Sequence, residues 1–157
     1  MRRKKYPLEV LLGLRVGRVK EATVELASAI REREVATELR QELETLRARA
    51  AAEATIVRDA EREALARGEL RVADLQRGGA WERLVQNEQR TLEQKVEGAA
   101  LVEQGAANHE ARARDALAGR KADADVVDKD RSRYLERVRK RIVAIEEESA
   151  SEAWRKR

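Results

Sequence analysis

The chain has 157 residues, of which 41% are charged and only 3% are aromatic, and its formal net charge at pH 7 is +4. Ala, Glu, Leu, Lys and Arg make up more than half of it, as is typical of coiled coils and long helices, so a globular core of ordinary width is not expected. The absence of cysteine excludes disulfides and thiolate metal sites and makes a reducing cytoplasm the default location.

The first residues, MRRKKYPLEVLLGLR, share a basic start and an apolar run with signal peptides. Glu9 and Arg15 interrupt that run and no small-residue cleavage site follows, so we do not expect a signal peptide. No apolar stretch approaches the ~20 residues that a membrane helix needs, and the sequence therefore predicts a soluble protein. The only proline, Pro7, leaves every later residue free to be helical.

A first helical arm is expected over about residues 8–66. Its apolar residues recur mostly at steps of three and four, the spacing that keeps one stripe facing a partner helix. A first run comprises Leu12, Val16, Val19, Thr23, Leu26 and Ile30, and a second comprises Leu39, Leu43, Leu46, Ala50, Val57, Ala60 and Ala64. The second run is offset by one heptad position from the first, which predicts a slip of the stripe within residues 31–38.

A connector is expected over about residues 67–80. Gly68 is a plausible stop for the first arm, and Gly78 with Gly79 would break the helix before the second arm begins. Trp81 would then lie in the first turn of the second arm.

The second arm is expected over about residues 81–153, with a similar slip between about 117 and 131. If the chain reverses near the connector, residue i meets roughly residue 150 − i, so the two slips lie at similar levels, as one antiparallel coiled coil with a local change of winding requires. We therefore predict an all-α fold, a long antiparallel two-helix coiled-coil hairpin with a short connector segment, over residues 1–157. Its Leu-, Ile- and Val-bearing ends near the termini should pack more strongly than its Ala-rich middle.

Patterns that carry catalysis or bind metals are missing from the sequence. The motif NHEARA, around the only histidine, His109, lacks the second histidine of a metalloprotease, and a polar residue in the helix seam is the favoured interpretation. The acidic cluster KADADVVDKD, residues 121–130, lacks the central Gly and the closing Glu of a calcium loop and is typical of a solvated helix surface. We expect neither an enzyme nor a resident cofactor or metal.

Basic residues gather near both termini. Four of the first five residues are basic, and the segment RSRYLERVRKR, residues 131–141, carries six basic residues against Glu136 alone. A hairpin would bring these segments and Arg15 and Arg18 to one end as a basic collar. Such a collar fits nucleic acid or an acidic protein surface, or it is a charged face that only meets solvent. A nucleic-acid partner is disfavoured because Tyr134 is the only aromatic residue within the collar.

The segment YPLEVLLGLRVGRVKEATVELASAIRERE, residues 6–34, resembles the start of the type III secretion and flagellar export stalk proteins, the FliJ/YscO family. Members typically begin with an aromatic-x-Leu-x-x-Leu-Leu-x-Leu-Arg pattern and continue as a helix rich in Ala, Glu and Arg. Here the pattern is supplied by Tyr6, Leu8, Leu11, Leu12, Leu14 and Arg15. The specific likeness is confined to this segment, whereas length and the two-arm plan are similar over the whole chain.

The resemblance implies a central stalk, similar to the coiled-coil part of the γ subunit of rotary ATPases. Such proteins are thought to insert the end bearing both termini into the pore of a hexameric export ATPase and to contact the membrane export gate with the opposite part, and some also handle export chaperones. The chain would then be monomeric alone and would work at the cytoplasmic face of a secretion apparatus. The candidate ATPase-binding residues are Arg15, Arg18, Arg133, Arg137, Lys140 and Arg141. The candidate export-gate-binding residues are Leu75, Trp81 and Leu84, and the alternative for these three is that they only cap the hairpin's own core.

Two other classes of function stay open at this point. One is a structural coiled-coil spacer or oligomerising adaptor, and the other is a basic coiled coil that binds nucleic acid. If the protein is an export stalk, the sequence is compatible with both a flagellar and an injectisome system, and the compact YPL opening slightly favours the injectisome.

Overall fold

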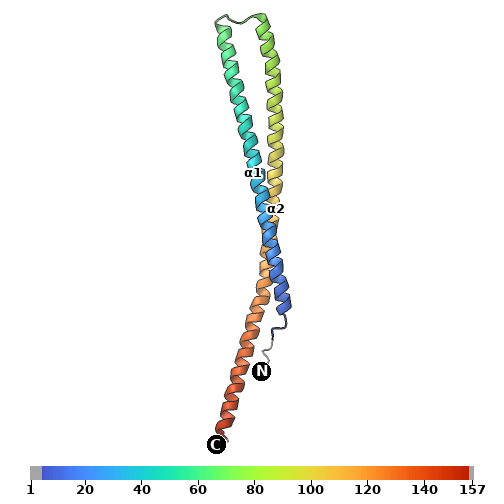
Figure 1. The fold of residues 1–157 in the computed structure, drawn as a ribbon, viewed down its shortest axis with the longest axis vertical. Helices are drawn as coiled ribbons and strands as arrows, with labels where there is room; N and C mark the ends of the chain where they lie inside the picture. Colours follow the sequence, from blue (N-terminus) through green and yellow to red (C-terminus); the bar gives the residue numbers. More distant parts are fainter. Residues whose placement is uncertain (1–4, 156–157) are drawn as a thin grey trace. The chain divides into compact units, whose positions relative to one another are not determined.

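Two long helices account for nearly all of the structure. The computed structural model describes residues 5–155, except the side chain of residue 153. Helix α1 spans Glu9–Ala66 and helix α2 spans Val72–Arg155, with no strand in the described range (Figure 1). The only proline lies just before α1, so no residue within either helix lacks a backbone N–H donor. The predicted all-α two-helix hairpin is confirmed.

Contacts divide the described chain into two compact units, each containing a stretch of both helices. The connector unit is Ala29–Glu110, and the terminal unit joins the described residues up to Ser28 with those from Ala111 onward. In the connector unit Arg33 pairs with Glu110 and Arg58 pairs with Glu82, so the two helices run antiparallel. In the terminal unit Glu9, at the start of α1, pairs with Arg131 of α2, which agrees with the same antiparallel orientation.

Helix α1 ends in a Schellman motif. Gly68 has a φ of 72°, in the left-handed region that glycine adopts without steric cost. Its N–H donates to the Leu65 carbonyl at 3.0 Å, and the Glu69 N–H donates to the Ala64 carbonyl at 3.1 Å. These bonds satisfy carbonyls that the last helical turn leaves without partners. The predicted stop at Gly68 is confirmed.

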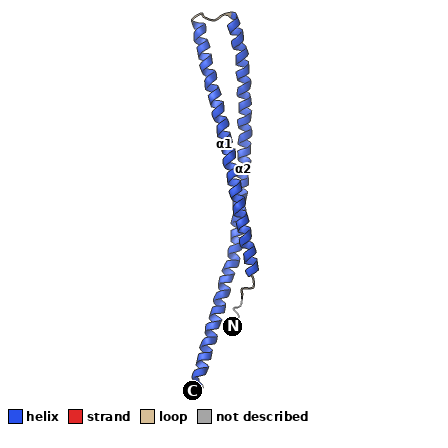
Figure 2. Cartoon of the chain, viewed as in Figure 1, coloured by secondary structure: helices blue, strands red, loops and turns tan. Residues whose placement is uncertain are grey.

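Helix α2 begins at Val72, nine residues before the predicted start at 81 (Figure 2). The Asp74 carboxylate accepts from the Arg71 N–H at 3.0 Å, which is the return half of a capping box, and the Arg71 carbonyl accepts the first helical bonds. The prediction that Gly78 and Gly79 break the helix is therefore wrong. A Cβ at Gly78 would meet the Glu61 carboxylate of α1, the end of a flexible side chain that can turn aside, and a Cβ at Gly79 would meet nothing within 4 Å.

The residues of α1 that face α2 follow one unbroken register. Steps of three and four carry it along the helix without an offset in 31–38, where the slip was predicted. Its members are Val19, Ala22, Leu26, Ala29, Arg33, Ala36, Arg40, Leu43, Arg47, Ala50 and Ala54. Leu39 and Leu46, assigned to the seam from the sequence, flank it and are 47% and 49% exposed. The apparent slip arose because arginines occupy alternate seam positions. A pattern of apolar residues alone passes over these arginines and continues through the leucines next to them.

Helix α2 likewise keeps one register, and the slip predicted within 117–131 is also wrong. The seam comprises Val85, Gln89, Leu92, Val96, Ala99, Glu103, Ala106, Glu110, Ala113, Leu117, Ala124, Val127, Arg131, Tyr134 and Val138. The residue numbers of facing pairs add up to about 141 in the connector unit (33 with 110, 58 with 82), not 150 as predicted. The shorter connector, 67–71, accounts for this difference of about nine.

Candidate partner-binding surfaces

The seam of the connector unit is closed by ion pairs as much as by apolar packing. Its buried hydrophobic residues are small, apart from Val85 and Leu92. Along the same seam, four arginines of α1 form ion pairs with four glutamates of α2. The pairs and their N···O distances are Arg33–Glu110 at 2.9 Å, Arg40–Glu103 at 2.5 Å, Arg47–Glu93 at 3.1 Å and Arg58–Glu82 at 2.7 Å.

Two of these carboxylates are held in their ionised form. Hydrogen bonds from the Thr37 hydroxyl and the Arg40 guanidinium lower the pKa of Glu103. The Arg58 guanidinium, which donates twice, lowers the pKa of Glu82. A lowered pKa in the folded state means that the stabilisation is present above the ordinary value near 4.5 and is lost as the pH falls below it. At neutral pH Glu82 and Glu103 are therefore charged.

His109 lies beside the seam, next to the buried Glu110. Its Nδ1 lies 3.1 Å from a carboxylate oxygen of Glu32 on α1. No group of three or more potential metal ligands occurs among residues 5–155. The acidic cluster of residues 121–130 contributes to the helix pairing instead, because Asp130 binds Tyr6 and the Asp123 carbonyl binds Arg15.

Tyr6 anchors the start of the chain to α2 in the terminal unit. Its side chain is buried, its hydroxyl donates to Asp130 Oδ2 at 2.7 Å, and its ring lies 5.5 Å from that of Tyr134 at an angle of 58°. Close by, Arg131 pairs with Glu9 at 3.1 Å. The sequence singled out Tyr6 only as the first residue of a family-like pattern. Its structural role is to fasten the residues before α1 onto the partner helix.

The surroundings of Tyr6 lead to a prediction about the pH at which its hydroxyl ionises. Burial and the hydrogen bond to Asp130 raise the pKa of Tyr6 to about 12. In a Tyr134→Phe variant Tyr6 is the only tyrosine, so tyrosinate absorbance should report that pKa alone. Adding Asp130→Asn should bring the midpoint back toward 10.0. Because the folded pKa is the higher one, the contribution of Tyr6 to stability is complete below pH 10 and is lost as the pH rises through about 12. A midpoint near 10 without the Asp130 change would contradict the buried position.

The predicted ATPase-binding residues do not form one cluster. Arg15 is half-buried and donates to the backbone oxygen of Asp123, whereas Arg18 is exposed. Since Arg15 lies beside Asp123, it is ten residues from Arg133 along α2, or about 15 Å of helix. The other four predicted residues are exposed on α2: Arg133, Arg137, Lys140 and Arg141.

The last part of α2 has no helix beside it in the terminal unit. Helix α1 begins at Glu9, and Tyr6 packs on Tyr134, so α2 continues past its partner (Figure 1). Every described side chain from Arg139 onward is exposed. Leu135, Ile142 and Ile145 are 46%, 45% and 56% exposed, and the prediction of stronger packing at the termini is therefore wrong. The register explains this, because the shorter connector leaves the end of α2 opposite no residue of α1.

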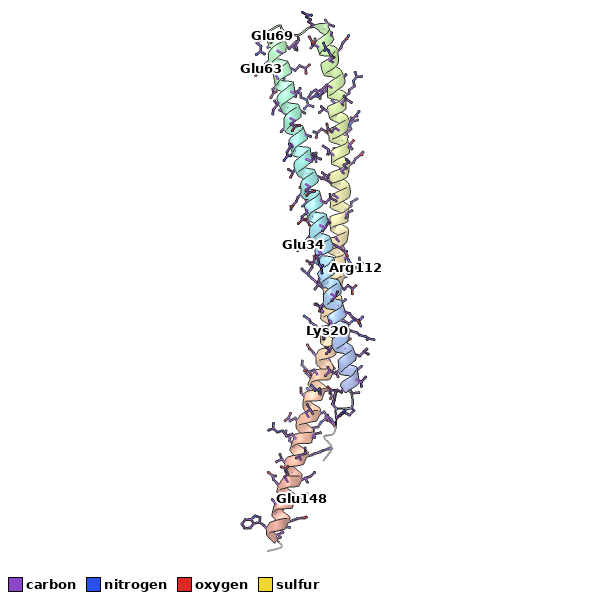
Figure 3. All side chains as sticks on the ribbon, viewed as in Figure 1. Lys20, Glu34, Glu63, Glu69, Arg112 and Glu148 are labelled. Carbon is purple, nitrogen blue, oxygen red and sulfur yellow. The ribbon has the colours of Figure 1, made fainter. Side chains whose placement is uncertain are left out.

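The predicted export-gate residues lie in the first turns of α2, near the connector, whose Glu69 is labelled in Figure 3. Leu75 and Leu84 are exposed, and Trp81 is half-buried. Val72, at the first position of α2, adds a further exposed apolar side chain. The connector end thus presents apolar side chains, while the four predicted basic residues of α2 lie in the terminal unit.

Comparisons with protein-family models, with curated proteins and with solved structures find no match. No helix among residues 5–155 contains an apolar stretch that could cross a membrane.

Proposed function

We propose that this protein is the central stalk of a type III protein export ATPase. In this role the end bearing both termini enters the pore of the hexameric ATPase, and the connector end meets the membrane export gate. The single observation that carries the proposal is the row of exposed basic side chains on the part of α2 that no helix covers. The resemblance of residues 6–34 to the FliJ/YscO family supports it independently.

The physical basis of the stalk's action is asymmetry. Two antiparallel helices inside a ring of six identical subunits cannot contact all of them equally. A contact that differs between subunits gives them different preferences for nucleotide states, so a stalk biases hydrolysis without catalysing it. Exposed guanidinium and ammonium groups suit an acidic-lined pore, where they also speed association.

The connector end would supply the second contact, to the export gate. Leu75 and Leu84 are exposed at a point where α2 begins, and Trp81 between them is only half-buried. Such apolar side chains contribute binding energy when a partner covers them. The resemblance to the FliJ/YscO family adds export chaperones as further proposed partners. A nucleic-acid partner is disfavoured because Tyr134, the aromatic residue of the basic segment, is half-buried in a tilted contact with Tyr6 and offers no open face to a base.

The proposal predicts that two sets of substitutions separate the two contacts. Reversal to Glu of the four predicted ATPase-binding residues of α2, together with Arg18, should weaken binding to the hexameric export ATPase by at least about tenfold and abolish stimulation of its hydrolysis. The reversed residues on α2 are Arg133, Arg137, Lys140 and Arg141. Leu75→Ser with Leu84→Ser should leave both ATPase readouts unchanged and weaken retention on the cytoplasmic part of the gate.

Each set of substitutions is the control for the other, because both leave the helix seam intact. Trp81 is kept in both, because its side chain is half-buried and its replacement would risk a change in the helix packing. Circular dichroism should show the same helix content in both variants as in the unmodified chain. Unchanged ATPase stimulation after charge reversal contradicts the assignment of the basic residues, and a wild-type chain that binds no export ATPase contradicts the stalk function itself.

A further inference from the structure

The uncovered part of α2 carries an apolar stripe with helical spacing. Leu135, Val138, Ile142 and Ile145 follow each other at steps of three, four and three, and Ser149 continues the series. Val138 is half-buried, and the three larger residues are about half exposed. In a helix this spacing places the side chains on one face. No described residue of α1 lies far enough along α2 to cover that face beyond Val138.

The residues that border this stripe have opposite charges in its two halves. In the heptad set by the stripe, the bordering positions are Arg139 and Arg141 in the first half and Glu146 and Glu148 in the second. Glu148 is labelled on this part of α2 in Figure 3. The stripe therefore has a basic half and an acidic half, separated by its two isoleucines. A segment with this pattern is complementary to itself when it is reversed.

We propose that the C-terminal segment of α2, residues 135–155, pairs antiparallel with the same segment of a second copy of the chain. Ile142 then packs against Ile145 of the second copy, and Val138 lies opposite Ser149. This register places Arg139 beside Glu146 of the second copy and Arg141 beside Glu148 of the second copy. Each of these contacts occurs twice by symmetry, as an interface between two identical surfaces requires.

The charges favour the antiparallel over the parallel arrangement. In a parallel pair, a bordering residue faces the one five positions further along the partner, so Arg141 meets Glu146 but Arg139 faces Tyr134. Antiparallel pairing gives both arginines a glutamate. Lys140 and Glu147 point away from the interface in either case, and Lys140 already pairs with Glu136 at 2.9 Å on that outer side.

The resulting dimer is weak and sensitive to salt. The apolar part of the interface is short, since Ser149 and Glu152 follow Ile145 in the stripe. Exposed ion pairs contribute little each and are screened by added salt. The dimer also covers Arg141, one of the residues proposed to bind the ATPase ring. A chain within the ring is therefore single, and the expectation of a monomer is revised only for the free protein.

Sedimentation equilibrium of the full chain over a range of concentrations tests this pairing. The unmodified chain should dimerise, with a dissociation constant that rises with salt. Arg139→Glu with Arg141→Glu, and separately Glu146→Arg with Glu148→Arg, should each raise that constant by about tenfold or more, because every attraction at the border becomes a repulsion. An equimolar mixture of the two variants should form a mixed dimer, since one is then acidic and the other basic along the whole border.

A matched control exchanges charges that the interface does not use. Lys140→Glu with Glu147→Lys reverses one basic and one acidic residue of the same segment and should leave the dissociation constant unchanged. If the unmodified chain is monomeric at every concentration, or if this control weakens the dimer as much as the border variants do, the pairing is wrong.

The orientation is tested with cysteines, which the natural sequence lacks. A mixture of Val138→Cys and Ser149→Cys chains should form a disulfide between them on oxidation. Ser149→Cys alone should not, because the two sulfurs would be about eleven residues, roughly 16 Å, apart along the helices. Efficient self-linking of Ser149→Cys would instead establish a parallel dimer and overturn the proposal.

Failure of this proposal is distinguishable from failure of the stalk function. Glu146→Arg with Glu148→Arg changes no residue proposed to bind the ATPase, so this variant should be monomeric and still stimulate the ATPase. A chain that dimerises as described without binding the ATPase would support the interface and contradict the stalk.

Discussion

Replacing Leu92 with Ala should lower the free energy of unfolding by about 2–4 kcal/mol. Leu92 is 5% exposed in a seam whose other buried residues are mostly alanines, so few neighbouring side chains are large enough to fill the space it leaves. The loss combines the transfer free energy of the side chain with that of the cavity. Urea unfolding followed by circular dichroism at the helix band measures it.

Leu101→Ala is the matched control for this experiment. It makes the same chemical change in the same helix and the same unit, but Leu101 is 70% exposed. We expect a change within about 0.5 kcal/mol, since exposed substitutions that disturb no cap or ion pair have small effects. Equal losses at the two positions would mean that Leu92 does not face α1.

The second large effect concerns an ion pair inside the seam. Replacing Arg40 and Glu103 together with Leu should raise the denaturation temperature by several degrees. Their side chains are 27% and 23% exposed, so both charges are partly desolvated, and an apolar pair of similar size escapes that cost. The new leucines would extend the apolar seam between Ala36 and Leu43. Thermal unfolding at neutral pH and low salt measures the shift.

The single substitutions provide the internal comparison. Arg40→Leu alone should lower the denaturation temperature, because the partly buried Glu103 carboxylate keeps its charge and loses a partner, leaving the Thr37 hydroxyl. Glu103→Leu alone should also lower it, although Arg40 retains its bond to Glu44. A double variant less stable than the unmodified chain would show that the pair contributes more than desolvation removes.

The fold class could be predicted because it depends on composition. Ala, Glu, Leu and Arg favour helix at nearly every position, and the one proline lies outside both helices. Gly68 could also be located, since a left-handed residue at a helix end is a local requirement. Gly78 and Gly79 misled the prediction because glycine ends some helices but is also tolerated inside others at a modest cost. Among the described glycines only Gly68 has a positive φ, and that backbone conformation marks the helix end.

The seam and the candidate surfaces were harder to predict for a shared reason. A search for apolar periodicity passes over Arg33, Arg40 and Glu103, which occupy seam positions as ion pairs. The surfaces depend on the register, and the register depends on the length of the connector. Starting α2 nine residues too late moved the expected facing residue by the same amount, so the end of α2 was expected to have a partner that it lacks.

The regular spacing of the ion pairs has a mechanical consequence. Arg33, Arg40 and Arg47 are seven residues apart, as are Glu103 and Glu110, so sliding α2 by one heptad in one direction would match Arg40 with Glu110 and Arg47 with Glu103. Two pairs can therefore form in a shifted register, so these ion pairs alone do not fix the register. The choice falls to features that occur once, the turn at Gly68 and the bond from Tyr6 to Asp130, which act as stops against sliding. A force that pulls Tyr6 free would remove one of these two stops and leave the turn at Gly68 to hold the register.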